Sequence, residues 1–84
     1  MTRYTVVWHR LCEDELVELW ISDDNRSALA AAVDRIDSEL AIDPSSKGSR
    51  VSDRSRELTV GSVQVLFRVR EDDRVVEVFS VAKV

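Results

Sequence analysis

Residues 54–82 of this chain read RSRELTVGSVQVLFRVREDDRVVEVFSVA, and this stretch decides the fold. Three short runs rich in Val, Leu and Phe are separated by two turn signals. The first signal, Gly61-Ser62, fits a two-residue hairpin of type II′, because glycine adopts positive φ without steric cost. The second is the acidic corner at residues 71–73, where an Asp side chain can bond its own backbone. The pattern predicts a three-stranded antiparallel meander.

Alternation along these runs predicts which side chains share a face of the sheet. In the middle run, Val63, Val65, Phe67 and Val69 fall on one face, and Gln64, Leu66, Arg68 and Arg70 fall on the other. In the run that ends at Val60, the residues that share a face are Arg56, Leu58 and Val60. Both faces of the last run, residues 75–83, are largely apolar, so alternation does not decide which of its faces points toward the core. We expect one apolar face against helices and an opposite face that carries arginines.

The residues upstream are typical of a layer that covers the apolar face. Residues 3–9 alternate as a strand, with Tyr4, Val6 and Trp8 on one face. Apolar residues at helical spacing predict one helix at residues 12–21 and a second at residues 25–42. The stripes expected to be buried are Cys12, Leu16, Leu19 and Trp20 in the first helix, and Leu29, Ala32, Val33, Ile36 and Leu40 in the second.

The short break at residues 22–25 predicts a helical hairpin, in which the alanines of the second helix permit a close approach to the first. Asp43-Pro44 ends the second helix, because the residue before a proline avoids the helical region. Residues 44–53 then form one long loop, either a flexible crossover or a functional loop. The predicted fold class is α+β in two layers, with an N-terminal strand, a helical hairpin and a three-stranded antiparallel meander.

The size and charge of the chain limit what it can bind. Its 84 residues predict a single domain over residues 1–84. The net charge of −4 is unevenly distributed, since residues 1–43 carry −6 and residues 44–84 carry +2. A general nucleic-acid binder would be basic overall, because phosphate neutralisation supplies most of its affinity. Any contact with RNA or DNA is therefore expected to be local, on the sheet or on the loop before it.

The sequence offers little for metal, redox or membrane chemistry. The single cysteine, Cys12, cannot form an internal disulfide, and one histidine, His9, leaves no credible zinc site. We expect Cys12 to be a small residue at a helix start and His9 to be an edge residue rather than a general base. No apolar run approaches the ~20 residues that cross a bilayer, and the N-terminus lacks a signal-peptide core. We expect a cytoplasmic protein without metal, cofactor or membrane partner.

The order of the predicted elements, together with particular residues, resembles a known family. The residues that carry the resemblance are Tyr4-x-Val6-x-Trp8, Glu15-Leu16-x-x-Leu19-Trp20, Asp34-Arg35-Ile36-Asp37-x-x-Leu40-x-x-Asp43-Pro44, Arg56-x-Leu58-x-Val60-Gly61, Val65-Leu66-Phe67-x-Val69 and Asp72-Asp73-Arg74-x-Val76-x-Val78. Their order and spacing over nearly the whole chain resemble the RelE/ParE superfamily. This superfamily is the toxin half of type II toxin–antitoxin modules, plasmid stabilisation modules among them.

The resemblance implies a small cytoplasmic toxin that is neutralised by an antitoxin segment wrapped over its surface. RelE-like members cleave mRNA in the ribosomal A site, with basic residues on the concave sheet face and a Tyr or His near the C-terminus. In this sequence Arg54 or Arg56 matches the second-strand arginine, and Arg68 or Arg70 matches the sheet cation. The C-terminal residues SVAKV contain neither Tyr nor His. Their lysine, Lys83, is a poor acid–base group at pH 7 unless its pKa is much lowered.

ParE-like members inhibit DNA gyrase without that catalytic set, and the sequence departs from the nuclease pattern in their direction. We therefore expect a ParE-like toxin, or a relative that has lost toxicity, that acts by binding proteins rather than by catalysis; if the chain is an enzyme, we expect an mRNA endoribonuclease. The alternatives are a ribosome-dependent mRNA endoribonuclease of RelE type and a structural or regulatory binding domain.

The resemblance also names candidate cations and partners. The candidate functional cations are Arg54, Arg56, Arg68, Arg70, Arg74 and Lys83, of which the five arginines are expected on one sheet face. The expected partner is an antitoxin encoded nearby. DNA gyrase, or the ribosome with mRNA, is the candidate target, and a second copy of the chain is a further candidate partner.

Overall fold

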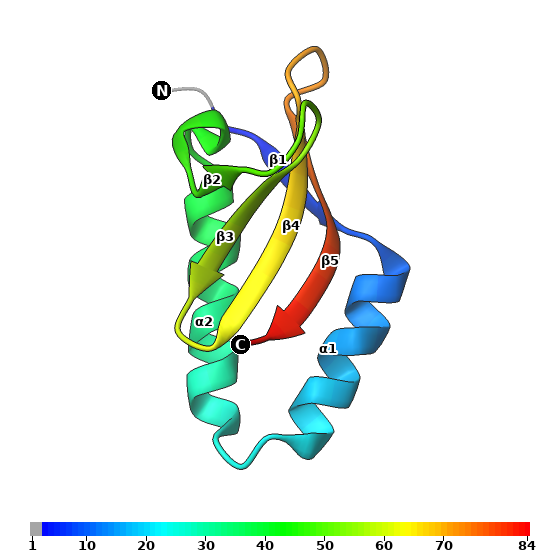
Figure 1. The fold of residues 1–84 in the computed structure, drawn as a ribbon, viewed down its shortest axis with the longest axis vertical. Coiled ribbons are helices and arrows are strands. Elements are labelled where there is room, and N and C mark those ends of the chain that lie inside the picture. The colour runs from blue at the N-terminus through cyan, green and yellow to red at the C-terminus, as the bar shows by residue number, and fades with distance from the viewer. Residues whose placement is uncertain (1–2) are drawn as a thin grey trace.

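The computed structural model describes residues 3–84, which form one five-stranded sheet with two long helices (Figure 1). The elements are β1 (Thr5–Trp8), α1 (Arg10–Ser22), α2 (Arg26–Leu40), the 3₁₀ turn η1 (Pro44–Ser46), β2 (Ser49–Arg50), β3 (Arg56–Val60), β4 (Val63–Arg70) and β5 (Val75–Lys83). The strand order is β1-β5-β4-β3-β2. β1 runs parallel to β5, and the other neighbouring strands pair antiparallel. The predicted α+β class, N-terminal strand and meander are confirmed.

The hairpin between β3 and β4 forms where the sequence predicts it. Val60 pairs with Val63 across the two-residue turn. Gly61 has a φ of 59°, and Ser62 is not among the non-glycine residues with positive φ, as a type II′ turn requires. The turn between β4 and β5 covers residues 71–74, and its last residue, Arg74, has a φ of 53°.

The core lies between the helices and one face of the sheet. The buried residues of this cluster are Cys12, Leu29, Ala32, Ile36, Leu40, Val63, Val65, Phe67, Val76, Val78 and Val81. Tyr4, Val6 and Trp8 pack against the cluster from β1, as their alternation predicts. Burying these apolar side chains, about 25 cal/mol for each Å² removed from water, supplies the main favourable term in folding.

A bulge in β5 explains why its inward face could not be predicted from alternation. Leu66 pairs with Ser80, but the next residue of β4, Phe67, pairs with Val78, so Phe79 is the extra residue. Val76 and Val78 are buried before the bulge, and Val81 is buried after it. The inward side chains therefore change from even to odd positions within a single strand.

The two helices pack on the sheet rather than closely on each other. α1 lies against β5, and α2 lies against β3 and β4. Figure 1 shows the helices apart along their length and joined by the short connection at their lower ends. The prediction that the alanines bring α2 close to α1 is therefore wrong: Ala32 is buried in the core shared with the sheet. Trp20 was expected in the buried stripe, but it is 43% exposed beside the gap between the helices.

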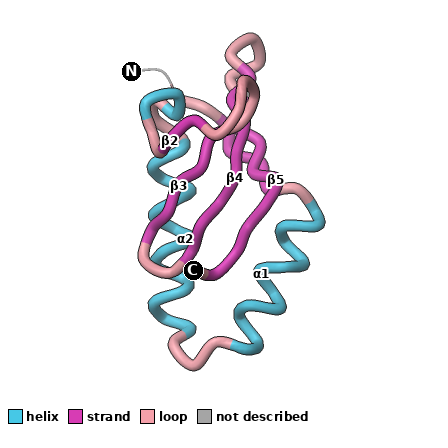
Figure 2. The backbone as a smooth tube through the Cα atoms, in the orientation of Figure 1, coloured by secondary structure: helices cyan, strands magenta, loops and turns pink. Residues whose placement is uncertain are grey.

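Helix ends differ slightly from the predicted ranges. The Asn25 side chain accepts a hydrogen bond from the backbone N–H of Ala28 (3.1 Å) and so caps the start of α2. α2 ends at Leu40, and Asp43 then adopts the left-handed conformation (φ 49°) before Pro44. The predicted long loop at residues 44–53 is only partly a loop, because it contains η1 and β2 (Figure 2). No helix in residues 3–84 is long and apolar enough to span a membrane.

Candidate functional site

Charged side chains gather on the sheet face that the helices leave open. Arg68 of β4 lies directly opposite Glu77 of β5 in the antiparallel register. Glu77 is in turn the register partner of Val7 in β1, so His9, two residues further, projects toward the same face. Arg70 comes from the end of β4. Three strands thus bring Arg68, Arg70, Glu77 and His9 together, and we call them the open-face cluster.

The Glu77 carboxylate is the centre of the open-face cluster. His9 Nε2 lies 2.9 Å from Glu77 Oε2, and Arg70 Nη1 lies 3.3 Å from Glu77 Oε1. The hydrogen bond with His9 lowers the pKa of Glu77, and the charges of Arg68 and Arg70 lower it further against the effect of burial. The Glu77 side chain is 18% exposed, whereas that of His9 is 40% exposed. Glu77 therefore stays ionised, and the imidazole remains within reach of a ligand.

Arg68 is held by an aromatic ring instead of an ion pair. Its guanidinium carbon lies 5.3 Å from the centre of the ring of Phe79, which follows Glu77 by two residues on β5. Its Nε is buried and has no hydrogen-bond partner among the described residues. Both terminal nitrogens of Arg70 are engaged, because Nη1 contacts Glu77 and Nη2 lies 3.0 Å from Asp73. Of the two cations, Arg68 is therefore the one with donor capacity to spare.

The open-face cluster has some of the groups that phosphoryl chemistry requires. A histidine paired with a carboxylate can accept a proton, and neighbouring guanidinium groups can stabilise a developing negative charge. A second acid–base group, which would protonate a leaving oxygen, is not in the open-face cluster. Within residues 3–84, no group of three or more His, Cys, Asp and Glu side chains is placed to hold a metal ion.

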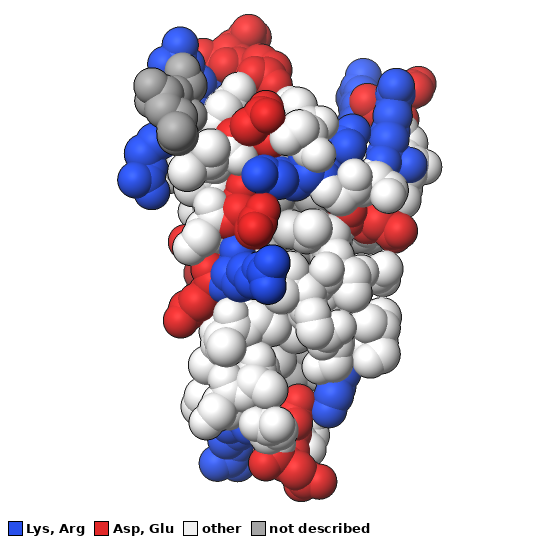
Figure 3. All heavy atoms as spheres, turned by 90° about the vertical axis from the view of Figure 1, so that its left-hand side faces the viewer, with Lys and Arg blue, Asp and Glu red and all other residues white. Residues whose placement is uncertain are grey.

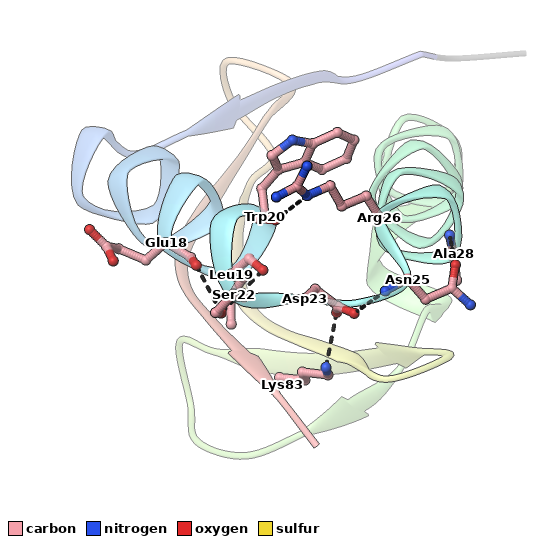
Figure 4. A network of polar contacts seen from close by, with 9 residues as sticks. All are labelled: Glu18, Leu19, Trp20, Ser22, Asp23, Asn25, Arg26, Ala28 and Lys83. Carbon is pink, nitrogen blue, oxygen red and sulfur yellow. Dashed lines mark hydrogen bonds and ion pairs between the residues drawn. The ribbon is translucent and has the colours of Figure 1, made fainter.

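Lys83, predicted as a candidate cation, lies away from the open-face cluster. Its Nζ is 2.9 Å from Asp23 Oδ2, and the Asp23 side chain is only 8% exposed. Figure 4 shows Lys83 reaching from the end of β5 to the connection between the helices. The Asn25 backbone N–H also donates to Asp23 (2.8 Å), and this bond, followed by the Lys83 contact, lowers the pKa of Asp23. The ion pair fastens the C-terminal strand to the helical layer.

Arg56 does not lie on the face where it was expected with the other arginines. It pairs with Phe67, a core residue, so the two side chains share the covered face. Arg56 donates from Nε to the carbonyl of Lys47 (2.9 Å) and from Nη2 to that of Gly48 (3.2 Å). The prediction that Arg56 shares a face with the other arginines is therefore wrong. The prediction from alternation, that Arg56 lies on the same face as Leu58 and Val60, agrees with the structure.

The remaining two candidate cations lie at turns. Arg74 is exposed in the turn between β4 and β5, where its carbonyl accepts the N–H of Thr5 (2.9 Å). Arg54 is exposed in the connection between β2 and β3. Figure 3 shows Lys and Arg side chains interspersed with Asp and Glu over the upper half of this side of the molecule, with more of both at its lower end. The six predicted cations thus occupy separate places, and only Arg68 and Arg70 share the open-face cluster.

The sequence did not single out Glu77 as a site residue. The signal is present, because Glu77 is the only charged residue between residue 75 and residue 82, where all the others except Ser80 are apolar. Its partner His9 lies 68 positions away and meets it through the parallel pairing of β1 with β5. The other residue considered for chemistry, Cys12, is buried, and burial raises the pKa of its thiol. Its predicted role as a small helix-start residue is confirmed.

Comparison with known structures identifies the fold. The toxin–antitoxin complex RelBE2 from Mycobacterium tuberculosis contains a chain 21% identical, with a TM-score of 0.81 over 100% of this chain and 94% of that chain. A mutant of the Escherichia coli toxin RelE in the free state is 16% identical, with a TM-score of 0.73 over 98% and 84%. The chromosomal ParDE system of Pseudomonas aeruginosa gives 14% identity and a TM-score of 0.72 over 98% and 97%.

These likenesses define the class of fold. The chain has the RelE/ParE fold over its whole length, as the resemblance in its sequence implied. An archaeal RelE–RelB complex from Pyrococcus horikoshii has the same architecture, with 19% identity and a TM-score of 0.62. No family model matches the chain, and no curated protein matches it in sequence.

Proposed function

We propose that this chain is the toxin component of a type II toxin–antitoxin module, or a relative that has lost toxicity, and that it acts by binding proteins. The observation that carries this proposal is the RelE/ParE fold, shared with RelBE2, RelE and ParDE over at least 98% of this chain. RelBE2 is a toxin–antitoxin complex, and so is the E. coli RelBE structure that this chain also resembles. The proposed partner is accordingly an antitoxin that covers the toxin surface.

The residues at the end of β5 favour the ParE manner of action, with DNA gyrase as the candidate target. Residues 80–84 contain no Tyr or His that could act as an acid–base group. Lys83, the one titratable side chain there, is engaged by Asp23 on the helix side of the sheet. The exposed cations Arg54 and Arg74 would then serve, with Arg68 and Arg70, to bind an acidic surface of a partner protein.

One observation supports a second candidate, a ribosome-dependent mRNA endoribonuclease of RelE type. His9 and Glu77 form a close pair beside Arg68 and Arg70. In that mechanism His9 would take the proton of the 2′-hydroxyl, and Arg68 would stabilise the charge on the phosphorus oxygens. The third candidate, a binding domain without toxicity, predicts that the open-face cluster only stabilises the sheet.

Expression in bacteria separates the toxin proposals from the third candidate. The proposal predicts growth arrest when the chain is expressed alone, and normal growth when the product of the adjacent reading frame is expressed with it. Growth that is unaffected under strong expression of a folded chain contradicts active toxicity. A complex between the two purified products would then still support the version of the proposal in which toxicity has been lost.

Two assays separate the toxin mechanisms. The proposed mechanism predicts that purified protein at micromolar concentration inhibits supercoiling by gyrase. It also predicts that ribosome-bound mRNA is not cleaved, so no new mRNA ends are mapped. The ribonuclease mechanism predicts codon-phased cuts that disappear in the His9→Ala and Arg68→Ala variants. Arg35→Ala is the matched control, because Arg35 is exposed on α2 and is not part of the open-face cluster. Cuts of that kind with unchanged supercoiling would contradict the ParE manner of action.

A further inference from the structure

A hollow of about 250 Å³ lies at the end of the sheet where the connection between β2 and β3 approaches the β4–β5 turn. The residues that line it are Ser45, Arg50, Ser52, Asp53, Arg54, Ser55, Arg56, Val69 and Glu71. Val69 packs against the core, and Arg56 shares the covered face with Phe67. The hollow, which we call the arginine hollow, is therefore on the helix side of the sheet and is distinct from the open-face cluster.

Three arginines from different elements line the arginine hollow. Arg50 belongs to β2, Arg56 begins β3, and Arg54 lies in the connection between them. Arg56 is fixed by its two hydrogen bonds to the carbonyls of Lys47 and Gly48. The Arg54 side chain makes no hydrogen bond or ion pair with any residue that the structure describes. One arginine is thus held in place, and another has all its donors free.

The wall of the arginine hollow is an ordered turn. The backbone N–H groups of Val51 and Ser52 both donate to the carbonyl of Ser55, at 3.0 and 3.2 Å. The hydroxyl oxygens of Ser52 and Ser55 lie 2.6 Å apart. These bonds fix the segment that carries Arg54 before any ligand arrives, which reduces the ordering cost of binding.

Two carboxylates also line the arginine hollow, but neither neutralises all three arginines. Asp53 pairs with Arg50 at 3.0 Å, yet its side chain is 97% exposed, so solvent screens the pair. Both oxygens of Glu71 are already accepting hydrogen bonds, from the Tyr4 hydroxyl and the Ser45 hydroxyl. With three arginines and two acids, the lining keeps a formal charge of +1 in a chain whose net charge is −4.

We propose that the arginine hollow binds a phosphate group, either as part of a nucleotide or as free inorganic phosphate. A guanidinium group presents a planar pair of donors that matches phosphate oxygens, and serine hydroxyls add further donors. A phosphate offers more acceptor oxygens than a carboxylate, so it can engage several of these donors at once. The hollow shares Arg54 with the proposed protein-binding surface, but the test below measures phosphate binding directly, so its outcome is separate from that of the toxin proposal.

A titration followed by ¹H–¹⁵N nuclear magnetic resonance tests the proposal on the full chain. The probes are adenosine 5′-monophosphate, inorganic phosphate, and adenosine as the matched ligand without phosphate. The expected result is saturable shifts at residues 50–56 with the two phosphate probes and none with adenosine. Tighter binding of the monophosphate assigns a nucleotide as the ligand, and equal binding assigns free phosphate.

Variants decide whether the arginines are responsible. Arg54→Ala removes a side chain that makes no hydrogen bond or ion pair within residues 3–84, so it should unfold like the parent chain while binding roughly tenfold or more weakly. Arg35→Ala makes the same change in net charge on α2 and should bind like the parent chain. Equal weakening in both variants, shifts with adenosine, no shifts at residues 50–56, or tighter binding of an oligoglutamate peptide would each overturn the proposal.

Discussion

The covered face and the open face of the sheet differ in what their side chains contact. On the covered face, Val63, Val65, Phe67, Val76 and Val78 are completely buried within the hydrophobic core. On the open face, the open-face cluster is partly exposed; His9 and Arg70 both contact the Glu77 carboxylate, and Arg68 lies over the Phe79 ring. The inward-facing side chains of each strand therefore specify the fold. The outward-facing side chains are free to carry charged groups for binding.

The largest effect expected from this difference is the loss of a core ring. Phe67→Ala should lower the free energy of unfolding by about 3–5 kcal/mol, because the large cavity it leaves cannot collapse fully. Leu66→Ala, one residue away on the open face and only partly buried, should cost less than half of that. Urea denaturation of the two variants measures the difference. Equal costs would mean that the faces are not distinguished by burial.

The second effect concerns the strand at the edge. Gly48→Ala would place a Cβ 1.8 Å from the carbonyl oxygen of Glu57, so β2 would have to move away from β3. We expect a loss of more than about 2 kcal/mol, because the positive φ of residue 48 adds to the collision. Gly61→Ala is the matched control, since its φ is also positive but its nearest contact is 3.9 Å away. Thermal unfolding should show a smaller loss for Gly61→Ala, and the reverse order would contradict this packing of β2.

The third effect is a dependence on pH that comes from the open-face cluster. Because the pKa of Glu77 is lowered in the folded state, its ionised form stabilises the fold above the unfolded value of about 4.3. This contribution should disappear as the pH falls through the lowered pKa. Glu77→Gln should therefore be less stable than the parent chain at pH 6. The loss in the free energy of unfolding should be smaller than for Phe67→Ala or Gly48→Ala. The difference in stability between the two chains should shrink as the pH falls below the unfolded pKa, and a constant difference would argue against the pairing with His9.

The smallest effect is expected at the turn beyond the open-face cluster. Asp73→Asn removes the contact with Arg70, in which both side chains are 56% exposed. Exposed pairs of this kind contribute about 0–1 kcal/mol, and Arg70 keeps its contact with Glu77. We expect a change below about 0.5 kcal/mol in the free energy of unfolding, measured by urea denaturation at low salt. A loss above about 1 kcal/mol would show that the turn is more important to the fold than its exposure suggests.

The alternation in the sequence was enough to predict the covered face. Val63, Val65 and Phe67 lie where the pattern placed them, and so do the inward residues of β1. Glycine at residue 61 correctly located the hairpin, because positive φ has a strong residue preference. These features depend on residues that are close together in the sequence, so a local sequence pattern is enough to predict them.

The features that could not be predicted depend on contacts between distant residues. The bulge at Phe79 changes the inward phase of β5, and an apolar run on both phases gives no sign of it. The pairing of β2 with β3 lies inside a segment whose composition is that of a loop. For the candidate site, alternation placed Arg68 and Arg70 correctly, but the contact of Glu77 with His9 needs the parallel pairing of β1 with β5.

The central claim is that the open face carries the proposed toxin function, whereas the buried core of the covered face supports the fold. The most direct measurement is bacterial growth during expression of the parent chain, Arg68→Ala and the control Arg35→Ala, with thermal unfolding measured for each. Our account predicts arrest by the parent chain and by Arg35→Ala, and growth with an equally folded Arg68→Ala. Arrest that persists in Arg68→Ala would contradict the claim.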